Sequence, residues 1–259
     1  MNKQGPYGIP YCDHTWSPVT GCFHGCTYCF ARRIAQRFKG SKAFPNGFAP
    51  SFHPGRLTEP LKLKRPSRIF VSDMGDLFGD WVPTEWIKQV LQVVEQCPQH
   101  TFLFLTKNPK RYADFVFPSN AWIGTSVENQ AAADERIPLL LRTPAATVRF
   151  ISAEPLLELV DLTSVQFNKY TTMNVLEGCG INLKSVCQAI PNIFSNKLNW
   201  VIVGAESGPN ARPMDEGWVE SLRDQCISAG TPFFYKQKIV NGKKVVMPEL
   251  EGQLPPLNA

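Results

Sequence analysis

The amino-acid sequence predicts an α/β fold, best matched by an incomplete (β/α) TIM-type barrel of about six parallel strands, with its active site at the carboxyl ends of those strands. Two observations lead to this prediction. Short apolar segments recur along the 259 residues, and segments with helical periodicity lie between them. The apolar share of 43% is enough to bury one large core. A doubly wound parallel sheet fits the same alternation.

The predicted strands are continuous apolar segments bounded by polar or turn residues. Continuous apolar character is typical of parallel strands that are buried on both faces. A shorter candidate, Thr15–Val19, leads into a cluster of cysteines. The other segments are Ile69–Ser72, Thr101–Leu105, Ala121–Ser126, Val148–Ser152, Trp200–Val203 and Pro232–Tyr235.

Four helices are predicted between these strands, from apolar residues at helical spacing. We expect Thr84 to cap the second helix, and Pro138 to kink the third or delay its start. Asp215 is a capping residue for the fourth helix and Gly230 its stop signal. The helical segments are Tyr28–Phe38, Thr84–Cys97, Asn129–Arg142 and Asp215–Ala229.

The alternation of strands and helices predicts one domain over residues 1–259. Residues 164–197 are polar and break the alternation, so they are interpreted as an insertion, and residues 238–259 as an extended tail over the surface. The first ten residues lack the pattern of a secretory signal, and no apolar run has the length of a membrane span. The sequence therefore predicts a cytoplasmic protein with no membrane segment.

Three of the eight cysteines, Cys22, Cys26 and Cys29, form a C-x3-C-x2-C pattern inside a loop over residues 20–30. Eight cysteines placed at random would give this pattern about 0.007 times, so chance is a poor explanation. Three thiolates can hold three corners of a [4Fe–4S] cubane and leave one iron open to a small molecule. Gly21 and Gly25 allow the tight backbone that such a loop needs.

Other interpretations of the three cysteines stay open at this stage. A structural zinc site needs a fourth ligand, which His14 or His24 could supply. A four-ligand electron-transfer cluster could use Cys12. Three unligated thiols in a core are a further alternative.

Polar residues follow almost every predicted strand. In parallel barrels and doubly wound sheets these strand ends form the active site. A run of carboxylates and lysines at such positions is costly unless the groups meet a ligand or one another. The residues are Asp73, Asp76, Lys107, Ser126, Glu128, Glu154, Glu206, Lys236 and Gln237.

The cysteine loop resembles the signature of the radical S-adenosylmethionine superfamily, C-x3-C-x-aromatic-C, with Tyr28 at the aromatic position. The resemblance implies a barrel fold, a [4Fe–4S] cluster on the three cysteines, and S-adenosylmethionine bound to the open iron. It also implies reductive cleavage of this cofactor to a 5′-deoxyadenosyl radical that takes hydrogen from a substrate. A one-electron reductant such as flavodoxin or ferredoxin would be the partner. Tyr28 would lie near the adenine.

A closer resemblance covers nearly the whole chain. It is to a three-cysteine family of radical SAM-like proteins from phages, prophages and bacteria (the phage Gp-type family). The similar stretches begin with Thr15–Cys22 and include Val71–Phe78, Leu105–Pro109, Gly124–Glu128, Ser152–Leu156, Val201–Gly208 and Phe233–Gln237.

The superfamily resemblance also suggests roles for the residues at the strand ends. Asp73 or Asp76 would accept hydrogen bonds from the cofactor's ammonium group, although the usual Gly-Gly-Glu is absent. Ser126 and Glu128 would hold its ribose or carboxylate end, and Lys107 and Lys236 would neutralise an anionic group. Glu154 and Glu206 would bind substrate.

The net charge of +5 is modest, but local basic stretches make nucleic acid, a nucleotide or a protein side chain a candidate substrate. Two other functions compete with a radical enzyme. One is a non-catalytic iron–sulfur or zinc module that binds DNA or a partner protein. The other is a methyltransferase without a cluster, which would leave the three cysteines unexplained.

Overall fold

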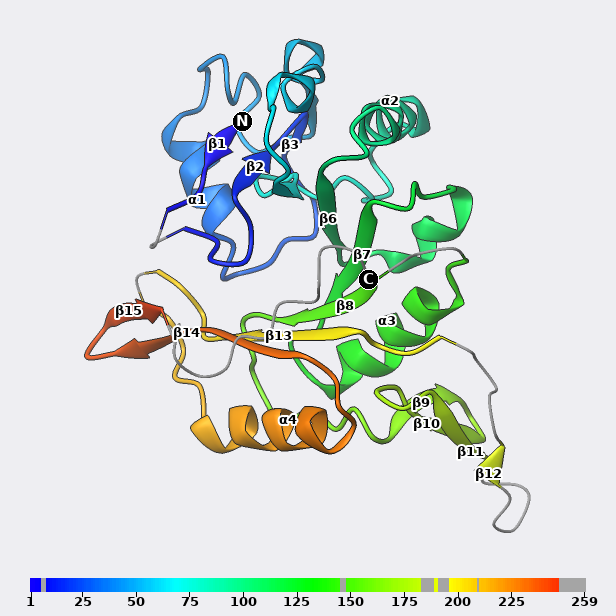
Figure 1. Cartoon of the computed structure of the whole chain (residues 1–259). Helices are drawn as coiled ribbons and strands as arrows, with labels where there is room; N and C mark the ends of the chain where they lie inside the picture. The colour runs from blue at the N-terminus through cyan, green and yellow to red at the C-terminus, as the bar shows by residue number, and fades with distance from the viewer. Residues whose placement is uncertain (6–7, 145–147, 183–188, 191–195, 209, 247–259) are drawn as a thin grey trace. The chain divides into compact units, whose positions relative to one another are not determined.

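The strands of this chain assemble into a mixed α/β structure with a large, mostly parallel central sheet (Figure 1). The computed structural model describes residues 1–5, 8–144, 148–182, 189–190, 196–208 and 210–246. The nine strands of the main sheet follow the order β1-β2-β5-β6-β7-β8-β13-β14-β15. The predicted α/β class is confirmed. The described strands do not form a closed barrel, and the incomplete TIM-type barrel stays a prediction.

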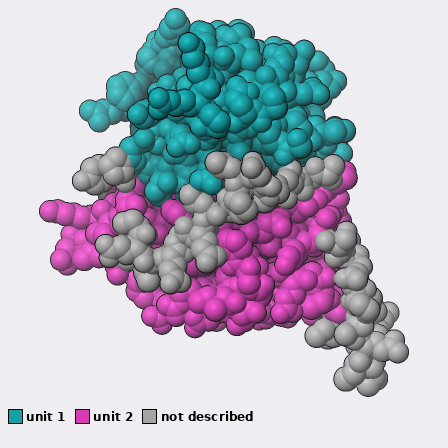
Figure 2. Space-filling model, in the orientation of Figure 1, with its two compact units in different colours: residues 1–123, 145–147 teal, residues 124–144, 148–259 magenta. Residues whose placement is uncertain are grey.

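The chain divides into two compact units, shown in separate colours in Figure 2. Unit 1 comprises residues 1–123 and 145–147, and unit 2 comprises residues 124–144 and 148–259. The single domain over residues 1–259 stays a prediction. Among the described residues, no helix is long and apolar enough to cross a membrane.

Unit 1 is built around parallel pairing of β2 (His14–Trp16), β5 (Arg68–Val71) and β6 (Thr101–Thr106). The large apolar side chains of these strands are buried except for Leu105, which is partly exposed, and this is close to what continuous apolar strands predict. The other elements are β1 (Asn2–Lys3), β3 (Val19–Thr20), α1 (Phe30–Arg37), β4 (Ser51–Phe52), α2 (Thr84–Glu95) and the start of β7 (Ala121–Ser126), with short 3-10 helices at Pro54–Arg56, Pro60–Lys62 and Pro109–Asp114.

Unit 2 pairs β8 (Val148–Ala153), β13 (Trp200–Gly204) and β14 (Phe233–Val240) in parallel. β14 then turns into an antiparallel hairpin with β15 (Lys243–Val246). The helices are α3 (Gln130–Arg142) and α4 (Glu216–Ser228). A separate antiparallel sheet contains β9 (Val165–Asn168), β10 (Thr171–Asn174), β11 (Cys179–Asn182) and β12 (Ala189–Ile190).

The structure refines several predicted boundaries. Helix α2 is capped by Pro83 and begins at Thr84, so the prediction of Thr84 as the cap is wrong by one residue. Pro138 lies inside α3 and does not delay its start, because Asn129 caps the helix through its side chain. The predicted insertion supplies the four-stranded sheet β9–β12. Residues 247–259 of the predicted tail lie outside the described residues.

Candidate functional site

The cysteine loop of unit 1 is bound to two neighbouring segments through the amides of Gly21 and Cys22. The Gly21 amide donates to the Met74 carbonyl at 2.8 Å, and the Cys22 amide donates to Phe48 at 3.1 Å. Gly21 has a φ of +90°, and a β-carbon there would lie 2.4 Å from the Ala49 carbonyl oxygen. Glycine is therefore required at position 21 for two reasons, its backbone angle and its close packing.

Two of the three thiols already accept backbone N–H groups. The Cys22 Sγ accepts from the His24 amide at 3.4 Å. Cys29 is the N-cap of α1, and its Sγ accepts from the Arg32 amide at 3.3 Å. Hydrogen bonds of this kind stabilise negative charge on sulfur, and they tune the potential of a cluster when one is bound.

The Cys22 thiol is half-buried, and burial raises its pKa from 9.0 to about 12. That value already includes the His24 N–H, which lowers the pKa, and the neighbouring Asp76, Cys26 and Cys29, which raise it. A cation bound to this sulfur would therefore replace a proton.

The side chains of the loop suit a cluster better than a single metal ion. Within the part of the chain that the structure describes, no three or more His, Cys, Asp or Glu side chains gather closely enough to hold one metal ion. A cubane instead takes its thiolates on different iron atoms, so its ligands surround the cluster and do not converge on a point. The donor set fits that chemistry, with three thiols of intermediate exposure on one short loop.

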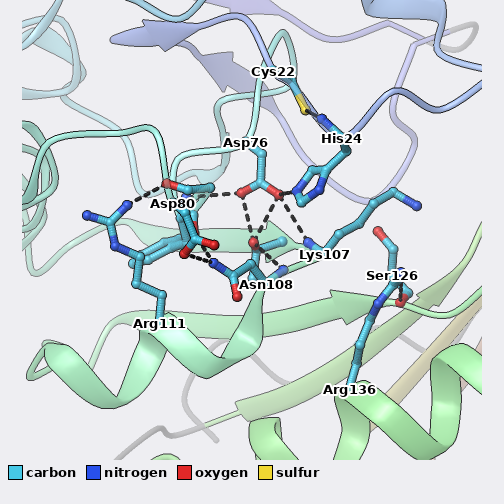
Figure 3. Close-up of polar contacts among 12 residues, drawn as sticks. Cys22, His24, Asp76, Asp80, Lys107, Asn108, Arg111, Ser126 and Arg136 are labelled. Atoms are coloured by element: carbon cyan, nitrogen blue, oxygen red, sulfur yellow. Dashed lines mark hydrogen bonds and ion pairs between the residues drawn. The ribbon is translucent and has the colours of Figure 1, made fainter.

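Asp76 is the centre of a hydrogen-bond network that joins the cysteine loop to the ends of β5 and β6 (Figure 3). Its buried carboxylate accepts from the Thr106 hydroxyl at 2.8 Å and from the amides of Phe78 and Lys107 at 3.0 and 3.1 Å. The His24 ring contributes a fourth contact, with Nε2 at 2.8 Å from Oδ2. His24 lies between Cys22 and Cys26, so its contact with Asp76 anchors the middle of the cysteine loop to this network.

The remaining candidates of unit 1 are partnered within the unit. The Lys107 ammonium group donates to the Tyr28 hydroxyl and lies 5.1 Å from the centre of its ring. Asp73 accepts from the Ser17 hydroxyl at 2.5 Å. Burial raises the pKa of the Asp73 carboxyl, against the hydrogen bonds that it receives. Unit 1 therefore brings together the cysteine loop, Tyr28, Asp76 and Lys107.

In unit 2, Glu128 follows β7 and is held by a cation. Its buried carboxylate accepts from the Arg136 guanidinium at 2.9 Å, and the same arginine donates to the Ser126 carbonyl at 2.9 Å. Arg136 lies on α3, so these contacts join the helix to Ser126 at the end of β7 and to Glu128 just after it. Figure 3 labels Ser126 and Arg136.

Glu154 and Lys236 form a second, largely buried ion pair in unit 2. The ammonium group lies 2.7 Å from both carboxylate oxygens. Lys236 and Gln237 were predicted to follow a strand, but β14 continues to Val240 and contains both of them. Gln237 is buried and donates to the Ala205 carbonyl at 2.8 Å. Glu206 pairs separately with Arg212 at 2.6 Å.

Sequence reasoning missed the partners of these residues more than the residues themselves. His24 was considered only as a zinc ligand, and the structure gives it a contact with Asp76. Arg136 and Arg212 were not singled out at all. Helical spacing could not have paired Arg136 with Glu128, because Glu128 precedes the helix, which begins at Gln130.

The fold and the loop define an α/β protein with three cysteines grouped beside polar strand ends. The family model described as "Protein of unknown function (DUF5131)" matches residues 7–253, so the chain belongs to that family. The comparisons with curated proteins and with solved structures found no match.

Proposed function

We propose that the protein is a radical S-adenosylmethionine enzyme whose [4Fe–4S] cluster is held by Cys22, Cys26 and Cys29. The observation that carries the proposal is the C-x3-C-x2-C loop, with N–H groups already directed at the sulfurs of Cys22 and Cys29. When bound, the reduced cluster would supply the electron that splits the sulfonium of S-adenosylmethionine, giving methionine and a 5′-deoxyadenosyl radical that takes hydrogen from a substrate.

The finer fold proposal accompanies the function. An incomplete TIM-type barrel would place the cofactor at the carboxyl ends of the strands. The parallel pairing of β2 with β5 and β6, and of β8 with β13 and β14, supports this arrangement within each unit. We further propose a cytoplasmic protein, since the cluster requires reduced cysteines.

The chain's own residues would position the cofactor. Tyr28 lies in the loop, and its hydroxyl is fixed by Lys107, which suits a ring placed beside an adenine. Asp76 already accepts from four donors, so we propose that it orients the loop through His24 and that Asp73 is the better candidate for an ammonium group. Ser126 and Glu128 remain candidates for the ribose or carboxylate end, with Glu154 and Glu206 for substrate. The substrate class stays a nucleic acid, nucleotide or protein.

The test uses the full chain, reconstituted with iron and sulfide without air. Dithionite and S-adenosylmethionine are added, and 5′-deoxyadenosine and methionine are measured. We expect both products from the unaltered protein and neither from Cys26→Ala, which should also lose the brown chromophore. Cys179→Ser is the matched control, because Cys179 is an exposed thiol outside the loop.

Three outcomes would contradict the proposal. Cleavage that survives in Cys26→Ala would show that the loop does not support the reaction. A cluster that assembles without S-adenosylmethionine affinity, and is lost in Cys12→Ala, would indicate a four-ligand, non-catalytic module. Tightly bound zinc in the purified protein, in place of iron and sulfide, would favour a structural metal site.

A further inference from the structure

The segment that contains the cysteine loop has an unusual charge distribution. No aspartate or glutamate occurs between Asp13 and Glu59. The same stretch has six basic residues, and most of them follow the third cysteine directly. These are Arg32, Arg33, Arg37, Lys39, Lys42 and Arg56. The segment is therefore uniformly positive around the loop.

Helix α1 adds an exposed apolar stripe to this charge. Phe30, Ile34 and Phe38, one turn apart, are 44%, 39% and 51% exposed. The adjacent side of the helix is buried through Ala31 and Ala35, which pack with Phe44 and Phe48. We call the exposed residues Phe30, Arg33, Ile34, Arg37 and Phe38 the α1 face; Figure 1 shows the helix within unit 1.

The two arginines of the α1 face differ in their effect on the helix: Arg37 lies in the last turn, where the helix dipole favours a cation, but Arg33 does not. Arg33 lies in the first turn of α1, where the helix dipole favours acidic residues, and that turn has none. Large apolar side chains in contact with water likewise give up the stabilisation that burial would provide. Basic and aromatic residues that cost local stability are instead typical of an interface.

The α1 face is joined directly to the proposed cluster site. Cys29 caps the helix, its Sγ accepts from the Arg32 amide at 3.3 Å, and Phe30 is the next residue. A molecule bound on this face lies beside the cluster ligand, which is what short-range electron transfer requires.

We propose that the α1 face docks an acidic protein that carries one electron, with the carrier oxidised by one electron as the cluster is reduced by one. This inference rests on the proposed function. The basic residues would attract the carrier, and Phe30, Ile34 and Phe38 would form the apolar centre of the contact. Complexes of this kind are small and transient.

A nucleic acid is the other polyanion that a basic surface could bind. Its single strands are held in grooves where bases stack on aromatic rings. Ile34, at the centre of the stripe, has no ring for a base to stack on. The stripe lies on the exposed surface of one helix, which does not form a groove by itself. The arrangement therefore favours a protein over a nucleic acid.

The experiment measures binding of a purified, FMN-containing flavodoxin to the full chain, with and without the reconstituted cluster. We expect Arg33→Glu/Arg37→Glu to weaken binding by about tenfold or more at low salt, and Ile34→Ser to weaken it by a few-fold. The control, Lys62→Glu/Lys64→Glu, makes the same change in net charge at exposed residues elsewhere in unit 1 and should bind like the unaltered chain. Glutamate suits the helix dipole at position 33 and opposes it at position 37, so urea unfolding of both charge-reversed variants is measured first to show that they are folded.

With reduced flavodoxin as the electron donor, the rate of cluster reduction should fall in the same variants that bind flavodoxin weakly. With dithionite as the donor, the rate should be the same in all variants. Unaltered binding of Arg33→Glu/Arg37→Glu, or equal weakening in both charge-reversed variants, would overturn the proposal. The proposal would also be overturned if flavodoxin did not bind and a DNA oligonucleotide bound through Arg33 and Arg37. If docking maps to the face but S-adenosylmethionine is not cleaved, the proposed function fails and the docking surface stands. If S-adenosylmethionine is cleaved with dithionite but the α1 face variants bind flavodoxin like the unaltered chain, the docking proposal fails and the proposed function stands.

Discussion

At the scale of single residues, Asp76 determines how the cysteine loop is held. Its two carboxylate oxygens receive a hydroxyl, two amides and the His24 ring, all between 2.8 and 3.1 Å. An amide in place of the carboxylate would direct N–H at groups that are themselves donors. We expect Asp76→Asn to lower the free energy of unfolding by about 2 kcal/mol, because buried donors lose their acceptor.

Urea unfolding of the full chain measures this change. Asp80→Asn is the matched control: Asp80 is exposed and accepts from the Asn108 side chain at 2.8 Å, so its loss should cost less than about 0.5 kcal/mol. Equal losses in the two variants would show that Asp76 does not support the loop.

The sequence indicates candidate site residues where the signal is local. The spacing of the cysteines, the aromatic Tyr28 and the polar residues after the strands need only neighbouring positions in the chain. The contact between His24 and Asp76 spans 52 residues, and no local pattern contains it. His24 was therefore interpreted as a zinc ligand, since the sequence shows a histidine beside thiols but not the carboxylate that it meets in the fold.

At the scale of elements, predicted starts and stops hold where a cap specifies them. The Asp215 side chain accepts from the Gly217 amide and caps α4, and Gly230 follows with a φ of +63°. β14 was predicted too short, because Lys236 and Gln237 resemble the end of an apolar strand. Both remain inside the strand, where tertiary partners bind their nitrogen atoms: Glu154 binds the Lys236 ammonium group and the Ala205 carbonyl accepts from the Gln237 side-chain NH2.

The ion pair between Glu154 and Lys236 links β14 to the end of β8. Removing Glu154 and removing Lys236 should not cost the same stability. Lys244 interacts with both charges, and burial and Lys236 lower the pKa of the Lys244 ammonium. We expect Glu154→Ala to cost about 3 kcal/mol, since it leaves two cations near one another, and Lys236→Ala to cost less, since Lys244 can replace part of the lost charge.

A double-mutant cycle in urea unfolding measures the coupling between the two residues. The exposed pair of Lys88 and Glu85, 3.2 Å apart, is the control and should contribute less than about 0.5 kcal/mol. A cost for Lys236→Ala that exceeds the cost for Glu154→Ala would contradict the role given to Lys244.

At the scale of the whole molecule, the sequence predicted the α/β class but not the order of its sheet. Alternating segments show which strands exist, and pairing between segments far apart in the chain decides their neighbours. β13 pairs with β8 although the β9–β12 sheet lies between them in sequence. The open order of the described strands, with antiparallel β1 and β15 at its ends, likewise depends on non-local contacts.

The pH dependence of stability is a property of the whole chain to which His100 contributes in a predictable direction. This side chain is 1% exposed, and burial lowers its pKa below 6.5, against hydrogen bonding to the carbonyls of Pro60 and Leu63. The unfolded chain therefore takes up the proton more readily than the folded one. The stability that neutral His100 provides is present above about pH 6.5 and is lost as the pH falls below that value, by at most ~1.4 kcal/mol per pH unit.

Urea unfolding at pH 8, 7, 6 and 5.5 tests this prediction in the unaltered chain and in His100→Gln. The variant should show a shallower loss of stability below pH 6.5. Asp73 acts in the opposite direction, because burial raises the pKa of its carboxyl, so the difference between the two proteins isolates the histidine. Parallel curves would mean that His100 takes up its proton as readily in the folded chain as in the unfolded one, and burial would then not control its titration.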